Sequence, residues 1–276
     1  MTQEELLEGI VLPIDKPRQW TSFQAVNKVK AVIRNLYGLK KFKIGHAGTL
    51  DPLATGLLLV CVGKATKSIP QLQDGDKVYT GTFVLGATTP CFDLERPVDR
   101  YFPYEHISQQ LVEEKAQTFT GTLLQVPPMF SAVKIDGQRA YEYARRDQPG
   151  AAASQSRTDD PTVTIQPKPV TIHSFEITAF REGRNIQNNQ SIQNNRSNPI
   201  TTHLYQNPLG EVPPHLPQAD FRIHCGKGTY IRSLARDLGL ALGSGAFLSA
   251  LRREQVGDYT VDHALTLDQV ANFLAQ

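Results

Sequence analysis

The feature that most constrains this chain is a run of six apolar residues, Leu57–Val62, bounded by Gly56 and Gly63. No charged or strongly polar side chain interrupts the run, so neither side of it suits contact with water. It must lie at the centre of a core, either as a strand covered on both faces or as a short buried helix. Periodicity does not distinguish the two. With 276 residues, 40% of them hydrophobic and 20% charged, the chain is long enough to bury such a core.

The flanking sequence predicts a mixture of strands and helices. Val11–Asp15 is typical of a short strand. The apolar spacing after it predicts an amphipathic helix with Thr21 or Ser22 as N-cap and Gly38 just past its end. Further strands are predicted over 77–86, 130–135, 170–180 and 220–225, and further helices, with loop in the last two, over 105–121, 138–146, 230–243, 246–257 and 266–276.

Two segments have the composition of surface insertions. Residues 148–160 are rich in Ala, Ser, Gln and Asp, and nine of the fourteen residues from Asn185 to Asn198 are Asn or Gln. A Pro-rich stretch follows, so we expect a long flexible insertion over 182–218, because this composition buries too little apolar surface to offset the entropy of ordering. The length of the chain is enough for one large domain or two ordinary ones.

Several classes of protein are excluded by composition. No run approaches the roughly 18 apolar residues of a membrane span, so no membrane partner is expected. Met1–Ile10 carries three glutamates and no basic residue, unlike a signal or transit peptide. Three cysteines, Cys61, Cys91 and Cys225, are too few and too far apart for a disulfide framework, which points to a reducing cytoplasm.

The near-neutral net charge of +2 hides two basic segments. Residues 15–50 contain eight bases against one acid, and residues 221–257 contain six bases against two acids. If the fold brings these segments together, they are the expected footprint of a partner rich in phosphate, such as a nucleic acid. The alternative is two solvated helix faces.

The densest candidate site is the segment GHAGTLDPLATG, residues 45–56. Its glycines allow tight turns and close approach of a ligand, and Pro52 pushes the backbone of Asp51 away from helical geometry. A rigid loop would then present one carboxylate, with His46 and Thr49 before it, as a nucleophile or general base. The alternative is an aspartate that only caps a turn.

Other chemistries fit these residues poorly. Lys64 is followed by Ala65, where a phosphate-binding loop needs Ser or Thr. No second His, Cys or carboxylate stands at ligand spacing around His46, so we expect no metal. A glycosidase would need a second marked carboxylate, and no GxSxG motif supports a serine hydrolase.

Two further residues are candidates for recognition. In CGKGTYIRSLARDLG, residues 225–239, a strand leads into a Gly-Lys-Gly turn at a predicted helix start, which suits an anion. Arg232, in the first turn of that helix, could pair with a buried carboxylate or simply be solvated. Tyr79, on a predicted strand, is either a core residue or a stacking surface for an extruded base.

Four segments together resemble the TruB-type tRNA pseudouridine-55 synthases, in the order in which that family carries them. They are GHAGTLDPLATGLLLVCVGKATK, KVYTGTFVLGATT, VPPMFSAVKIDGQRAYEYAR and CGKGTYIRSLARDLG. The resemblance covers most of the chain from Val11 to Thr266 outside the insertions. It implies the pseudouridine-synthase fold, an α+β fold with a mixed central β-sheet flanked by helices, in a single domain over residues 1–276. It also implies conversion of uridine to pseudouridine in the T-arm loop of tRNA, without cofactor or metal, by a cytoplasmic enzyme that we expect to be a monomer.

The resemblance also implies roles for individual residues. Asp51 corresponds to the catalytic aspartate, Arg232 to an arginine that forms a salt bridge with it, and Tyr79 to a tyrosine that packs on the target base. The residues that match substrate-binding positions of the family are His46, Tyr230, Leu251 and Lys16.

The implied reaction is physically coherent with these residues. A stacked uridine is inaccessible, so the nucleotide must be extruded at a cost of a few kcal/mol, which basic flanks offset through phosphate contacts. A carboxylate nucleophile can start the rearrangement, and a dry pocket keeps the detached base from escaping. The sequence leaves three routes open for Asp51: attack on the sugar C1′, attack on uracil C6, or action first as a base that forms a glycal.

The chain departs from the family pattern in places. Gln19 stands in KPRQWTS where glycine is typical, and Thr89 is followed by Pro-Cys-Phe-Asp instead of the usual continuation. A C-terminal RNA-binding module of the PUA type is expected to be absent or vestigial, because few residues follow Thr266. The rival hypothesis is a non-catalytic module that binds or folds tRNA, which would have no need of a rigid carboxylate facing phosphates.

Overall fold

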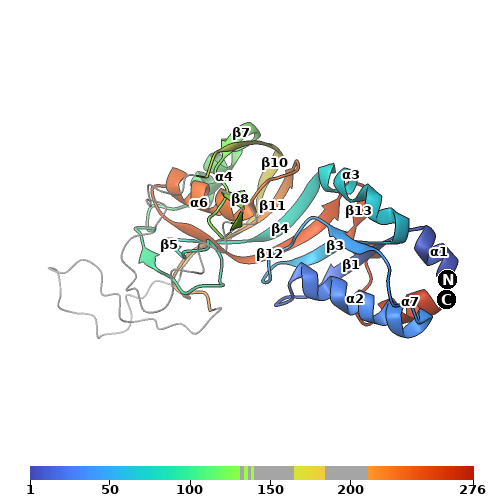
Figure 1. The fold of residues 1–276 in the computed structure, drawn as a ribbon. Coiled ribbons are helices and arrows are strands. Elements are labelled where there is room, and N and C mark those ends of the chain that lie inside the picture. Colours follow the sequence, from blue (N-terminus) through green and yellow to red (C-terminus); the bar gives the residue numbers. More distant parts are fainter. Residues whose placement is uncertain (131–133, 136–137, 140–164, 184–210) are drawn as a thin grey trace. The chain divides into compact units, whose positions relative to one another are not determined.

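The computed structural model describes residues 1–130, 134–135, 138–139, 165–183 and 211–276 (Figure 1). The described residues form two compact units. Unit 1 lies within Met1–Thr80, Arg222–Lys227 and Ala250–Gln276, and unit 2 within Gly81–Phe221 and Gly228–Ser249. Three strands contribute residues to both units: β4 (Lys77–Leu85), β11 (Gln218–Cys225) and β12 (Ala246–Val256). The expectation of a single domain over 1–276 stays a prediction.

Unit 1 is built around β3 (Thr55–Val62), the strand that contains the apolar run. β1 (Ile10–Lys16) pairs with it antiparallel along its length, while β2 (Ile44–Ala47) and β12 pair with it elsewhere, β12 in parallel register. Because β1 already occupies one edge of β3, β2 and β12 must share the other edge. The strand order in this unit is β1-β3-β12-β4-β11, with β13 (Tyr259–Thr260) paired to β12.

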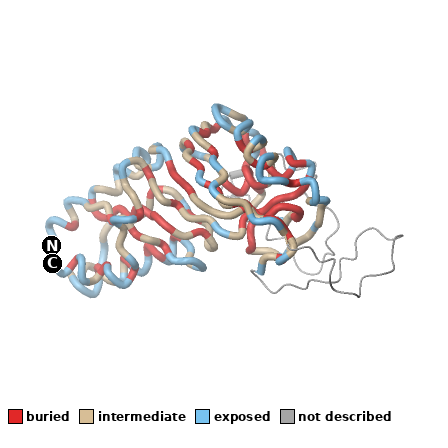
Figure 2. Tube along the Cα trace, turned by 180° about the vertical axis from the view of Figure 1, so that it is seen from behind, coloured by how far each residue is buried: buried red, intermediate tan, exposed pale blue. Residues whose placement is uncertain are grey.

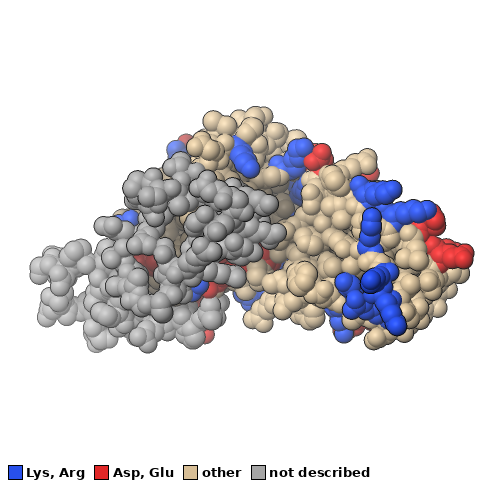
Figure 3. All heavy atoms as spheres, in the orientation of Figure 1, with Lys and Arg blue, Asp and Glu red and all other residues tan. Residues whose placement is uncertain are grey.

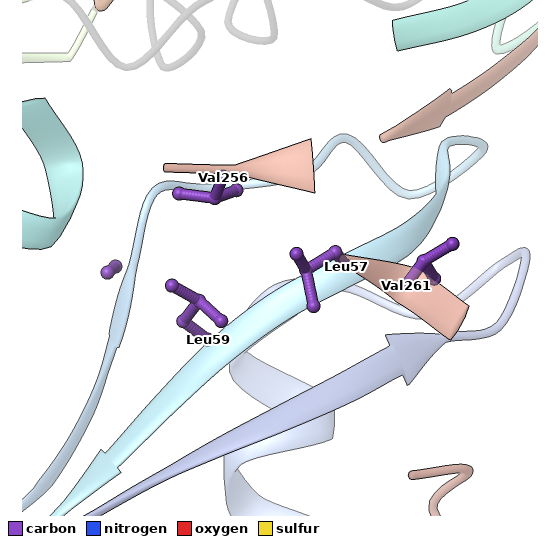
Figure 4. Close-up of a cluster of buried hydrophobic side chains, with 5 residues drawn as sticks. Leu57, Leu59, Val256 and Val261 are labelled. Atoms are coloured by element: carbon purple, nitrogen blue, oxygen red, sulfur yellow. The ribbon is translucent and has the colours of Figure 1, made fainter. Parts of the chain in front are cut away.

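The core of unit 1 explains why the run is apolar throughout. Every residue from Leu57 to Val62 is fully buried. Leu57 and Leu59 project from the same side of β3 toward Val256 and Val261, forming a cluster on which the helix α3 (Ile69–Asp74) packs (Figure 4). Figure 1 shows the helix α2 (Ser22–Tyr37) on the opposite side of the sheet from α3. The run is therefore a strand buried on both faces, which resolves the choice between strand and helix.

The helix α2 (Ser22–Tyr37) confirms the predicted caps. The Thr21 side chain accepts a hydrogen bond from the backbone of Gln24, whose side chain reciprocates in a capping box, and Gly38 ends the helix with a left-handed φ of 66°. Its buried residues form one stripe along the helix (Figure 2). The other helical segments of unit 1 are α1 (Gln3–Glu8), the 3₁₀ segment η1 (Gly63–Ser68), η4 (Val261–His263) and α7 (Val270–Ala275).

In unit 2 the strand order is β12-β4-β11-β10-β7. β10 (Lys168–Arg181) pairs antiparallel with β7 (Gly121–Gln125). Phe83 and Phe221 stack in its core with ring centroids 4.1 Å apart, and Phe175 lies beside them. The remaining elements are α4 (Gln109–Gln117), α6 (Ile231–Ala241), β5 (Ala87–Thr88), β6 (Arg100–Tyr101), β8 (Lys134–Ile135) and β9 (Gln138–Arg139).

The prediction for the segment that forms β12 was wrong. Residues 246–257 were expected to form helix and loop, and Ala246–Val256 is a strand. Its Ala, Leu, Arg, Glu and Gln residues favour helix in isolation, but a strand at this place fills the sheet between β3 and β4. Tertiary pairing thus overrides local propensity.

The predicted insertions are only partly described. Residues 148–160 and most of 182–218 lie outside the described residues. The end of the second segment belongs to the core of unit 2: Leu216 is buried, and the carbonyl of Pro217 accepts a hydrogen bond from the Leu85 amide at 2.9 Å. The helix predicted over 138–146 is contradicted at Gln138–Arg139, which form β9.

All three cysteines lie in the interior. Cys61, Cys91 and Cys225 are buried and form no disulfide among the described residues, and burial raises the pKa of Cys61 to about 11. Among the described residues, no helix has both the length and the apolar character needed to cross a membrane.

Gly56 provides a test of how closely β12 approaches β3. Gly56 has a φ of 98°, and a Cβ there would lie 2.3 Å from the Arg253 carbonyl oxygen. Gly56→Ala should lower the free energy of unfolding by about 2–5 kcal/mol, through left-handed strain and displacement of β12. Gly38→Ala is the matched control, since Gly38 has a φ of 66° in open space; it should cost about 1–2 kcal/mol. Equal losses in urea unfolding would contradict the close approach.

Candidate active site

The loop between β2 and β3 presents Asp51, and its backbone is held from both sides. The Ser22 hydroxyl donates to the Leu50 carbonyl at 3.1 Å and accepts from the Leu50 amide at 2.9 Å. The Gln19 amide donates to the Pro52 carbonyl at 2.8 Å, and the Ala54 amide donates to the Asp51 carbonyl at 3.1 Å. The start of α2 and the segment before it therefore fix the chain immediately before and after the candidate catalytic carboxylate.

Lys16 lies beneath this loop, completely buried. Its ammonium donates to the carbonyls of Trp20 at 2.6 Å, Pro17 at 3.0 Å and Pro52 at 3.4 Å. Burial lowers the pKa of Lys16 to about 8, and the nearby charge of Asp51 acts in the opposite direction. The substrate-binding role assigned to Lys16 stays a prediction; the contacts in the structure are those of a support for the Asp51 loop.

Arg253 is a functional candidate that the sequence analysis counted only as a charge. It is the largest fully buried side chain of the described residues, 2% exposed. Its Nε donates to the Leu57 carbonyl at 2.8 Å, and its Nη2 donates to the Gly48 carbonyl at 3.0 Å. One guanidinium therefore holds the chain before and after Asp51. The sequence signal that could have revealed Arg253 is the pair of adjacent arginines in ALRRE. Neighbouring residues of a strand point to opposite faces, so one arginine of such a pair points inward.

The other member of that pair, Arg252, points outward and is neutralised. It forms a bidentate pair with the carboxylate of Asp15 at 3.1 and 2.8 Å. Lys227 pairs with Asp74 at 2.9 Å, and Arg236 with Asp237 at 2.8 Å. Most basic side chains of the segment 221–257 are therefore either paired with carboxylates or buried.

The basic residues of segment 15–50 remain more available. Figure 3 shows Lys and Arg side chains gathered on unit 1. The exposed bases of the segment are Arg18, Lys28, Arg34, Lys40, Lys41 and Lys43.

Three predicted site residues of unit 1 lie on the strands around the loop. Tyr79, on β4, is 8% exposed; burial raises the pKa of its phenol, and the positive charge of Arg253 opposes that shift. His46, on β2, has a pKa lowered by burial, and its Nδ1 is a buried atom without a hydrogen-bond partner among the described residues. Leu251, on β12, is half-buried and precedes Arg252, which pairs with Thr55.

The two predicted residues of unit 2 lie at the start of α6. The buried side chain of Gln125 holds the Tyr230 backbone. It accepts a hydrogen bond from the Tyr230 backbone amide at 2.8 Å and donates one to the Tyr230 backbone carbonyl at 3.2 Å. Arg232 is 6% exposed and donates to the carbonyls of Phe130 at 2.7 Å and Cys91 at 3.2 Å. It also lies 3.8 Å from the buried carboxylate of Asp93.

Asp93 is an acidic partner of Arg232 that the sequence analysis did not mark. The expected salt bridge between Arg232 and Asp51 concerns the two units together and stays a prediction.

Comparison with known families gives matches over most of the chain. A model described as TruB family pseudouridylate synthase (N terminal domain) matches residues 34–195. A second, described as tRNA pseudouridylate synthase B C-terminal domain, matches residues 232–276.

Relatives over nearly the full length carry the same description. The chain is 48% identical to the tRNA pseudouridine synthase B of Flavobacterium johnsoniae over 97% of this chain and 96% of the relative. It is 41% identical to the protein of that name from Phocaeicola vulgatus, over 98% and 94%. These matches extend the similarity well beyond the loop motifs.

Solved structures support the fold. The crystal structure of a Cbf5-Nop10-Gar1 complex contains a chain that matches with a TM-score of 0.61 at 23% identity, over 99% of this chain and 56% of that one. A structure of an H/ACA RNP bound to a substrate RNA containing 2′-deoxyuridine matches with a TM-score of 0.58 at 21% identity, with the same coverage. The α+β fold with a mixed sheet is thus that of the pseudouridine synthases.

The pKa of Lys16 gives a test of its burial. Since the pKa falls from 10.5 to about 8 on folding, the unfolded chain binds more protons between these pH values. The unfolding free energy of the wild type relative to Lys16→Met should therefore rise from pH 8 to pH 10.5 and be level below pH 8, in urea titrations at each pH. The control, Lys64→Met, removes a lysine exposed in the same unit and should give a level difference. A level difference for Lys16→Met would contradict a buried ammonium.

Proposed function

This chain belongs to the TruB family of pseudouridylate synthases, and from that premise we propose that it converts uridine 55 in the T-arm loop of tRNA to pseudouridine. The observation that carries the proposal is the Asp51 loop, which is held by hydrogen bonds from Ser22, Gln19 and Arg253. A catalytic carboxylate must be held in a fixed position relative to the reacting nucleotide, whereas a surface that only binds RNA does not need such a rigid loop. The printed names of the Flavobacterium and Phocaeicola relatives support tRNA as the substrate.

The chemistry is a rearrangement within one nucleotide. The bond from C1′ of ribose to N1 of uracil breaks, the uracil turns, and a bond forms from C1′ to C5. The proton of C5 is lost and N1 gains a proton, so the product is an isomer and no electrons are exchanged with another molecule. Asp51 is the proposed initiating group, by attack on C1′ or C6 or by proton abstraction that forms a glycal.

The target base must leave its stack before this reaction starts. Tyr79 is the proposed packing partner for the extruded base, and its burial next to Arg253 supports a fixed ring orientation. His46, Leu251 and Tyr230 are proposed to contact the nucleotide or its neighbours. Arg232 is proposed to face Asp51 as a charge partner.

Asp51→Asn tests the mechanism directly. The amide keeps the shape of the side chain but cannot act as a nucleophile or a base, so release of tritium from [5-³H]uridine in tRNA should fall by at least about 10³-fold. Binding of tRNA should stay within a few-fold of the wild type. The control is Asp262→Asn, an exposed aspartate of the same unit, which should retain full turnover.

The rival function makes the opposite forecast. A non-catalytic tRNA-binding module would release no tritium even as the wild type, while still binding tRNA. Turnover that survives Asp51→Asn would instead show that the enzyme uses another group.

The exposed lysines of segment 15–50 are proposed to contact tRNA phosphates. The double substitution Lys40→Ala and Lys41→Ala should weaken tRNA binding and reduce the slope of log K against log salt by about 2, one for each phosphate that is no longer neutralised. Lys64→Ala is the control, because that ammonium already pairs with Glu8 at 2.7 Å. An unchanged salt slope in the double variant, measured by filter binding, would place the tRNA elsewhere.

A further inference from the structure

Arg253 reaches across the start and the end of the segment that carries Asp51. Its planar guanidinium donates to the Gly48 carbonyl before the aspartate and to the Leu57 carbonyl after it. Its backbone is also paired with Gly56 in the parallel register of β12 and β3. Side chain and main chain of one residue therefore close the loop at both ends.

The same guanidinium lies close to Tyr79. Burial raises the pKa of the Tyr79 phenol, and the positive charge of the guanidinium opposes that shift. Tyr79 and the Asp51 loop come from β4 and from the segment before β3, which are not adjacent in the sequence. Arg253 lies on the strand between β3 and β4, so its side chain is next to both.

The placement is costly unless the arginine has a specific role. Removing a cation from water costs several kcal/mol, and a well-packed apolar side chain is often as stable at such a site. The hydrogen-bond acceptors of Arg253 are two backbone carbonyls, both neutral, whereas the neighbouring Arg252 has the carboxylate of Asp15. What arginine supplies and an apolar residue does not is a rigid fork of donors with a fixed charge.

We infer that Arg253 is a positioning residue for the proposed reaction, which holds the Asp51 loop and the Tyr79 ring in the one arrangement that receives the extruded uridine. The inference rests on the proposed function for its kinetic consequence. The hydrogen bonds themselves do not depend on that function. Arg253 acts through Asp51 and Tyr79, so its removal should slow the chemical step more than it weakens tRNA binding.

The first test separates chemistry from binding. Arg253→Met fills the site with an apolar chain and removes the donors, and Arg253→Lys keeps the charge without the fork. In single-turnover assays both variants should be slower by about 10²-fold, the effect of a misplacement of about 1 Å, with the tRNA dissociation constant within about 3-fold. Arg252→Met is the matched control and should stay within about 3-fold in both quantities.

The rates are compared at a temperature at which circular dichroism shows each variant to be as fully folded as the wild type. Rates within 3-fold of the wild type in both variants would overturn the inference. A normal single-turnover rate with tRNA binding weakened more than 10-fold would also overturn it, since Arg253 would then act on RNA affinity and not on positioning.

The second test does not need activity. In Arg253→Met without RNA, amide hydrogen exchange of the peptide covering residues 48–57 should accelerate by at least about 10-fold, while peptides from α6 and β10 exchange at the wild-type rate. Unchanged exchange in the loop would overturn the inference even if turnover fell. If the wild type makes no pseudouridine, the proposed function fails, and loop exchange still decides whether Arg253 positions the loop.

Discussion

Unit 1 depends on the complete burial of β3. A strand that is apolar on both faces and paired on both edges leaves no side for solvent, so a functional group can enter only at the ends of the strand. Gly56 is the second residue of this strand and Gly63 follows it, and they have positive φ values of 98° and 62°. The Asp51 loop is the connection into the first of these ends. The candidate site thus lies where the buried strand meets the loop that leads into it.

Two buried cations support that loop, and they do so differently. Lys16 gathers carbonyls from Pro17, Trp20 and Pro52, which fixes the chain after Asp51. Arg253 donates to the carbonyls of Gly48 and Leu57, on the two sides of the loop, and its charge also acts on Tyr79. The charges of Lys16 and Asp51 also interact. Lys16 therefore both supports the loop and contributes positive potential at the proposed nucleophile.

Local features were predictable from the sequence, and features that depend on distant partners were not. The helix α2 could be predicted from Thr21 and Gly38, because capping depends only on residues within about one turn of each helix end. The Asp51 loop was recognisable from glycines and Pro52 in a single segment. The strand β12 was missed because its residues favour helix and its neighbour β3 lies far back in the sequence.

The charges illustrate the same limit. Lys16, Arg253 and Arg232 were counted as members of a basic surface, and all three are buried. A sum of charges along a segment carries no information on which side of a strand each residue faces, or on which acid it meets. Asp93 and Asp15 become partners of Arg232 and Arg252 only once the sheet has formed.

The hydrogen bonds of Arg253 also have a consequence for biosynthesis. The guanidinium lies 196 residues after Leu57 and 205 residues after Gly48. During translation the N-terminal part of a chain leaves the ribosome first, and long-range pairings wait for the rest. A nascent chain can hold the entire GHAGTLDPLATG segment outside the ribosome and still lack the guanidinium that closes it. The candidate active site is therefore completed only after Arg253 has been made, so fragments that end before it carry the aspartate without its full support.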